Sequence, residues 1–191
     1  MSKTKNSVQK IALGAVFTAL VVVLQLLGTF VRFGPFAISL VLVPIVLGAA
    51  LCDWKVGAWL GFMFGFTVLV SGDAAAFLTV SVPGTVVTVL LKGISCGLVA
   101  GLVYKAVAKK NRYLAIIAAA VVCPLVNTGI FLLGCKLFFM ETIAGWAAAF
   151  GFQNATTYLF VGMIGANFLI ELAANILLAP AILRIVNLFQ K

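Results

Sequence analysis

Six apolar stretches, separated by five breaks, occupy almost the whole of this 191-residue chain. Hydrophobic residues make up 64% of it and charged residues only 9%, whereas soluble domains carry about 25% charged residues. A helix needs roughly 20 mostly apolar residues to cross a bilayer. We therefore predict an all-α integral membrane protein, in which residues 1–191 form a single domain, a bundle of six transmembrane helices. The predicted helices are at roughly 8–28, 37–52, 55–71, 83–106, 113–139 and 159–188.

The basic residues indicate which way this bundle faces, because six crossings bring both termini to one side of the membrane. Ten of the 13 Lys and Arg residues lie near the chain ends or the second and fourth breaks, namely Lys3, Lys5, Lys10, Lys55, Lys105, Lys109, Lys110, Arg112, Arg184 and Lys191. Basic loops stay in the cytoplasm, so we place both N- and C-termini on the cytoplasmic side of the membrane. Topology thus explains the net charge of +9, and we predict the lipid bilayer, not nucleic acid, as a partner.

Three basic residues, Arg32, Lys92 and Lys136, fall instead in or near the outer half of the membrane. Arg32 and Lys136, together with Asp73, belong to the predicted outer mouth, where long charged side chains that reach toward water are ordinary. Lys92 differs because it lies deep in a predicted helix, about 13 to 14 Å from the outer end, where an unpaired charge costs at least about 2.5 kcal/mol. We expect Lys92 to be paired or to face a cavity.

The last apolar stretch carries a polar stripe. Asn167, Glu171 and Asn175 recur every four residues and so share one face of a helix. Lipid cannot face this stripe, so we expect it to point into the protein. With a rise of about 1.5 Å per residue, Lys92 reaches the depth of Glu171, which predicts a direct or ligand-bridged ion pair. The alternative is a purely structural pair between two helices.

Asn127 lies three residues after Pro124 in the fifth stretch, at a depth that also puts it in the outer half. It either joins the polar cluster or bonds backbone groups that the proline leaves free. The third and fifth breaks, 71–84 and 140–157, are semi-apolar, so we expect either lids over the bundle or segments lying among lipid headgroups. The candidate substrate-binding residues are Arg32, Asp73, Lys92, Asn127, Asn167, Glu171 and Asn175.

Small residues repeat every four positions on three of the predicted helices. The ridges are Gly57, Gly61 and Gly65; Gly93, Gly97 and Gly101; and Ala15 and Ala19. Such ridges let helices approach closely. We interpret the glycine ridges as packing within the chain, and Ala15 and Ala19 as a smooth patch that can receive a partner.

The sequence argues against ATP hydrolysis and against histidine-based catalysis. The chain has no G-x-x-x-x-G-K-[ST] loop, so it does not hydrolyse ATP by that route, and it has no histidine and therefore no H-E-x-x-H. The four cysteines stand singly and are interpreted as packing residues. We predict no catalytic residue, no metal and no cofactor. A membrane bundle with an interior polar cluster indicates a binder or carrier of a small solute.

Several segments in order along the chain carry a family resemblance, namely Ile11–Ala19 after the basic start, Val43–Ala49, Gly57–Phe62, Lys92–Gly97 and Pro124–Gly129. Together with length and topology, they resemble the substrate-binding S components of energy-coupling factor (ECF) vitamin transporters over essentially the whole chain. The resemblance implies a six-helix vitamin-binding protein with its ligand near the outer face. It also implies docking through Ala-x-x-x-Ala, here Ala15 and Ala19, onto a transmembrane scaffold subunit coupled to two ATPase subunits.

The basic residues of the outer half suit an acidic vitamin such as pantothenate or a folate, while a flavin, cobalamin or a queuosine precursor stays open. The first hypothesis is therefore the substrate-specific component of an ATP-driven importer, without enzymatic activity of its own. A second is a stand-alone secondary carrier that uses Glu171 as a proton relay. A third is a non-transporting scaffold in which the polar stripes only hold helices together.

Overall fold

The structure is a computed structural model that describes residues 2–29, 32–33, 36–37 and 40–189. Within this part of the chain, one pair of two-residue antiparallel strands, β1 (Arg32–Phe33) and β2 (Phe36–Ala37), accompanies the helices. Five helical segments among the described residues are long and apolar enough to cross a membrane, and a shorter apolar helix joins them. The chain is an all-helical membrane protein, as predicted.

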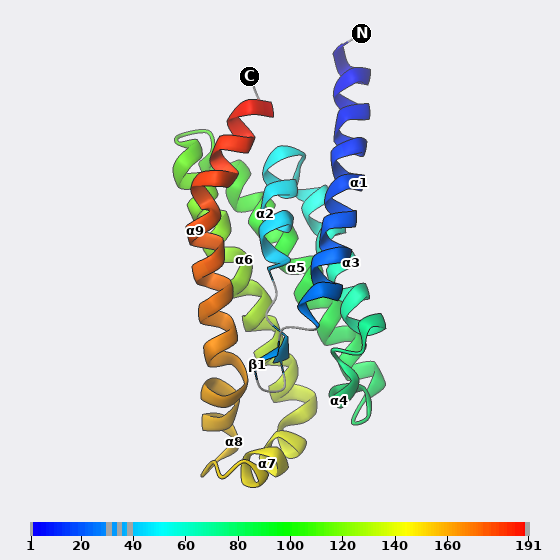
Figure 1. Ribbon diagram of the computed structural model, residues 1–191, viewed down its shortest axis with the longest axis vertical. Coiled ribbons are helices and arrows are strands. Elements are labelled where there is room, and N and C mark those ends of the chain that lie inside the picture. Colours follow the sequence, from blue (N-terminus) through cyan, green and yellow to red (C-terminus); the bar gives the residue numbers. More distant parts are fainter. Residues whose placement is uncertain (1, 30–31, 34–35, 38–39, 190–191) are drawn as a thin grey trace.

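The helices in chain order are α1 (Ser2–Gly28), α2 (Leu42–Leu51), α3 (Trp54–Ser71), α4 (Ala75–Leu78), α5 (Val82–Val107), α6 (Arg112–Gly134), α7 (Met140–Ala149), α8 (Ala155–Thr157) and α9 (Ala166–Phe189). Two π-helical segments, η1 (Cys135–Phe139) and η2 (Tyr158–Gly165), join α6 to α7 and α8 to α9. The start of α1 and the end of α9 lie at one end of the bundle, here called the terminal end (Figure 1). The short helices α4, α7 and α8 lie at the opposite, far end.

Side-chain caps determine where three long helices begin. Asp53 before α3, Ser81 before α5 and Asn111 before α6 each accept hydrogen bonds from N–H groups of the following turn, which have no partner inside the helix. Asp53 also forms a salt bridge with Lys10 of α1, whose Nζ atom lies 3.4 Å from Oδ2 of Asp53. Partial burial acts to raise the pKa of Asp53, but the N–H groups and Lys10 outweigh it and hold that pKa below its usual value. The bridge therefore ties α1 to α3 at neutral pH.

Two predicted helices differ from the observed ones. The second begins at Leu42 and not at 37, because residues 36–37 belong to the strand pair; Pro44 fits its first turn, where an N–H group is not needed. Its ten residues rise only about 15 Å, half of the bilayer core. The fifth is longer than predicted, since α6 continues through η1 and α7 to Ala149. Much of the predicted fifth break is therefore helical.

The two glycine ridges face each other between α3 and α5. A Cβ atom placed on Gly57 would lie 2.5 Å from the carbonyl oxygen of Gly97, and one placed on Gly61 would overlap the carbonyl oxygen of Gly93. Because these neighbours are backbone atoms, they cannot turn aside as a flexible side chain does. The prediction that the glycines pack helices within the chain is confirmed.

Gly61→Ala is expected to lower the free energy of unfolding by about 1–3 kcal/mol, because the added methyl group forces α3 away from Gly93. The matched control is Gly129→Ala in α6, where a Cβ atom would meet nothing within 4 Å. Alanine favours helix by about 1 kcal/mol over glycine, so this control is expected to be neutral or stabilising. Thermal unfolding in detergent compares the two, and equal melting temperatures would contradict the packing argument.

Buried apolar side chains form two clusters. The larger one joins the long helices and includes Leu42, Ile45 and Ile116. The smaller one lies at the far end and is rich in aromatic rings. In it, the ring of Phe77 from α4 lies 5.0 Å from that of Phe139 and 5.5 Å from that of Trp146. The third break therefore folds back onto the bundle through α4.

Large apolar side chains also cover the outside of the bundle. Examples from five helices are Leu20, Phe66, Leu102, Leu125 and Leu177. A soluble monomer rarely exposes so continuous an apolar surface. These side chains face the hydrocarbon of the bilayer.

Candidate functional site

A cavity of about 100 Å³ lies inside the bundle where the two apolar clusters meet. Its lining comes from α1, α3, α4, α5, α6, η2 and α9 and from the turn before α4, so it belongs to the far half of the bundle (Figure 1). The polar lining residues are Gln25, Asp73, Lys92, Asn127, Thr128, Asn167 and Glu171. Phenylalanine, valine, alanine, isoleucine and methionine side chains make up the rest.

Five of the seven predicted site residues line this cavity, namely Asp73, Lys92, Asn127, Asn167 and Glu171. Asn175 does not: it is fully buried, and its Nδ2 donates to the backbone carbonyl of Glu171 at 2.9 Å. Arg32 is placed by its backbone in β1, and its side chain lies outside the described part of the structure. Lys136, the third outer basic residue, is exposed on η1 away from the cavity.

Lys92 projects from α5 between two aromatic rings. Its Nζ atom lies 5.3 Å from the ring centres of both Phe64 and Phe131, and the negative faces of such rings stabilise a cation. Among the described residues, no carboxylate oxygen lies within 4.0 Å of Nζ. Lys92 and Glu171 thus share one cavity without the direct ion pair that was one of the two predicted forms.

Glu171 of α9 is 3% exposed, so water hardly reaches its carboxylate. Its side chain accepts a long hydrogen bond, 3.5 Å, from Nδ2 of Asn167 one turn away. The Oδ1 atoms of Asn167 and of the buried Asn127 have no hydrogen-bond partner in the described part of the chain. This side of the cavity therefore offers the Glu171 carboxylate and two amide oxygens as hydrogen-bond acceptors.

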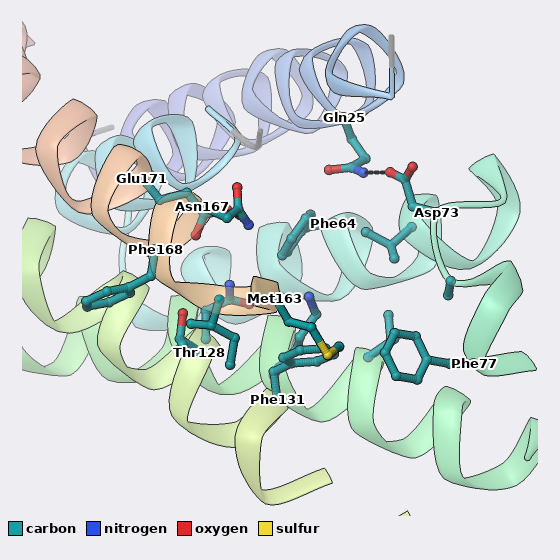
Figure 2. A pocket seen from close by; sticks show the side chains of 16 residues that line it. Gln25, Phe64, Asp73, Phe77, Thr128, Phe131, Met163, Asn167, Phe168 and Glu171 are labelled. Carbon is teal, nitrogen blue, oxygen red and sulfur yellow. Dashed lines mark hydrogen bonds between the residues drawn. The ribbon is translucent and has the colours of Figure 1, made fainter. Parts of the chain in front are cut away.

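A second polar pair comes from Gln25 and Asp73, in which Nε2 of the amide donates to Oδ2 of the carboxylate. Figure 2 shows this pair at one end of the cavity and Asn167 with Glu171 at the other, with Phe64 between them. Gln25 is not among the predicted site residues, although its amide interrupts the apolar run of α1, a signal that points to it. The aromatic lining was not predicted either, because nothing in the sequence separates rings at a cavity from rings facing lipid.

Ala15 and Ala19 are exposed on α1 and line a separate, open groove beside α3. Trp59 of α3 borders the groove, and its Nε1 donates to Oγ1 of Thr18 at 3.1 Å. The patch predicted to receive a partner is thus on the surface, apart from the cavity.

Fold and cavity together define a multi-pass membrane protein that can hold a small polar molecule within its helices. The family model for the ECF transporter substrate-specific component matches residues 9–183, and the chain belongs to this family. It is a multi-pass transport protein of the bacterial cell membrane. The chain is also similar to the pantothenic acid transporter PanT of Lactococcus lactis subsp. cremoris (strain MG1363), with 27% identity over 199 residues that cover 95% of this chain and 94% of the relative. No solved structure matches the chain significantly.

Proposed function

We propose that this chain is the substrate-specific component of an ATP-driven vitamin importer and that its substrate is pantothenate. The observation that carries this proposal is the cavity, in which one cation between two aromatic rings faces buried hydrogen-bond acceptors. Pantothenate has a carboxylate at one end and two hydroxyl groups at the other, so Lys92 suits its acid and the acceptors suit its donors. The name of the PanT relative supports the same substrate.

We also propose that the chain crosses the membrane six times with both termini in the cytoplasm, and that the short helix α2 makes one of these crossings. The support comes from the terminal end of the bundle, which holds the start of α1, the α5–α6 connection and the end of α9 (Figure 1). Lys10, Lys105, Lys110 and Arg184 belong to these segments, and basic residues gather on the cytoplasmic side. The cavity at the far end then lies in the outer half of the membrane, where a substrate arrives.

Energy for transport is proposed to come from partners. The chain has no phosphate-binding loop of the G-x-x-x-x-G-K-[ST] type, and its family supplies the substrate-specific component of a transporter. The partners are a transmembrane scaffold subunit and two ATPase subunits. The exposed Ala15 and Ala19 are the proposed contact with the scaffold, because small residues let two helices approach closely.

Purified chain in detergent is expected to bind radiolabelled D-pantothenate saturably, at one molecule per chain, with mass spectrometry identifying any vitamin that co-purifies. Membrane vesicles that contain the chain alone are expected to show little uphill uptake. Vesicles that also contain the scaffold and ATPase subunits are expected to accumulate pantothenate when ATP is present. Absence of pantothenate binding, or a different vitamin that co-purifies stoichiometrically, would overturn the assigned substrate; uphill uptake by the chain alone would overturn the proposed class.

A further inference from the structure

Glu171 and Lys92 are oppositely charged, line the same cavity and do not pair within 4.0 Å. A helix-bonding ion pair that served only stability would be in direct contact, because a desolvated charge repays its loss of water only through close partners. Glu171, at 3% exposure, instead accepts a 3.5 Å bond from Asn167. A gap between two opposite charges that line one cavity is the arrangement that a bridging ligand completes.

Two amide oxygens in the same cavity as Glu171 receive no hydrogen bond from the described part of the chain. Asn167 points its Nδ2 at Glu171 and leaves Oδ1 without a partner in the described part of the chain. The reverse orientation of this amide would bring two oxygens together, so its direction is set by Glu171. Asn127, across the cavity on α6 and 6% exposed, also has an Oδ1 atom with no partner among the described residues. Acceptors without donors cost free energy when buried, so a molecule in the cavity that donates hydrogen bonds to these oxygens is favoured over one that does not.

We infer that Glu171, with Asn167 and Asn127, selects the substrate by accepting hydrogen bonds from its hydroxyl groups, while Lys92 holds its acid group. This inference rests on the proposed function and assigns an orientation to the substrate in the cavity. A carboxylate beside Glu171 would place two negative charges together, whereas a hydroxyl group there supplies the missing donor. The acid therefore goes to Lys92 and the hydroxyl end to Glu171. A ligand with the acid but without hydroxyl donors leaves the buried acceptors unpaired and is rejected.

The test compares two ligands on the full chain in detergent: D-pantothenate and its dideoxy analogue, in which both hydroxyl groups are replaced by hydrogen. Wild-type chain is expected to prefer pantothenate by on the order of 10- to 100-fold in Kd, the range of hydrogen bonds to a charged group. Glu171→Leu is expected to reduce this preference to near unity. Glu171→Gln keeps an acceptor without the charge and is expected to give an intermediate preference.

The matched control is Leu169→Met, which alters an exposed residue of α9 outside the cavity lining and is expected to keep the wild-type preference. Because the measured quantity is a ratio between two ligands on one protein, a general weakening of the site cancels. If Glu171→Leu does not fold, Glu171→Gln alone decides the question. A preference that stays at the wild-type value in the Glu171 variants overturns this inference and leaves pantothenate as substrate. Failure of wild-type chain to bind pantothenate overturns both.

Discussion

Lys92→Met is expected to weaken D-pantothenate binding by roughly 30-fold to several thousand-fold. The reason is that the acid of the ligand then enters a water-poor cavity without a cation, and loss of one partner of a buried charge pair costs about 2–5 kcal/mol. Methionine keeps the length of the side chain and its contact with Phe64 and Phe131, so the packing around position 92 changes little. Equilibrium binding of radiolabelled pantothenate measures the effect.

Two controls distinguish the loss of the Lys92 charge from a disturbance of the fold as the cause of weaker binding. Lys105→Met removes a charge from an exposed position on the same helix α5 and is expected to bind pantothenate as wild type does. The neutral alcohol analogue of pantothenate lacks the carboxylate, so wild-type chain and Lys92→Met are expected to bind it with similar affinity. Pantothenate binding at wild-type strength by a folded Lys92→Met chain would exclude Lys92 as the group that holds the acid.

Ala15→Leu is expected to abolish assembly with the scaffold and ATPase subunits and to reduce pantothenate uptake by cells to background, a loss of roughly tenfold or more. Ala15 lies exposed in the groove beside α3, and a bulky side chain there keeps a partner helix from the close backbone approach that small residues permit. The cavity is lined by other residues, so binding of pantothenate by the isolated chain is expected to stay unchanged. Co-purification of the subunits measures assembly, and uptake of labelled vitamin by cells measures transport.

Ala173→Leu provides the comparison for this prediction, because Ala173 is an exposed alanine on α9, outside the groove. It is expected to assemble and transport normally. Normal assembly of Ala15→Leu would move the partner surface elsewhere, and a parallel loss of pantothenate binding by the isolated chain would mean that the substitution disturbs the fold itself.

The long helices were predictable because each one depends mainly on its own composition. Runs of apolar residues predict the segments that enter the bilayer, and glycines four residues apart predicted the contact between α3 and α5 that the structure confirms. Periodicity also indicated that Asn167 and Glu171 share a face of one helix that looks inward. Helix ends were less predictable, because the continuation of α6 through η1 into α7 depends on packing against Phe77 and the other far-end rings.

The cavity itself depended on the tertiary structure. Depth along a helix placed Lys92 near Glu171, but only packing of α5 against α6 and α9 decides whether two such charges touch or leave a space. Asn175 belongs to the same stripe as Glu171 and yet lies off the cavity, since its amide bonds the helix backbone. The amino-acid sequence is enough to predict a membrane bundle and its inward polar faces, because hydrophobicity and periodicity are local properties. Which of those polar groups surround one cavity was decided by contacts among helices far apart in the chain.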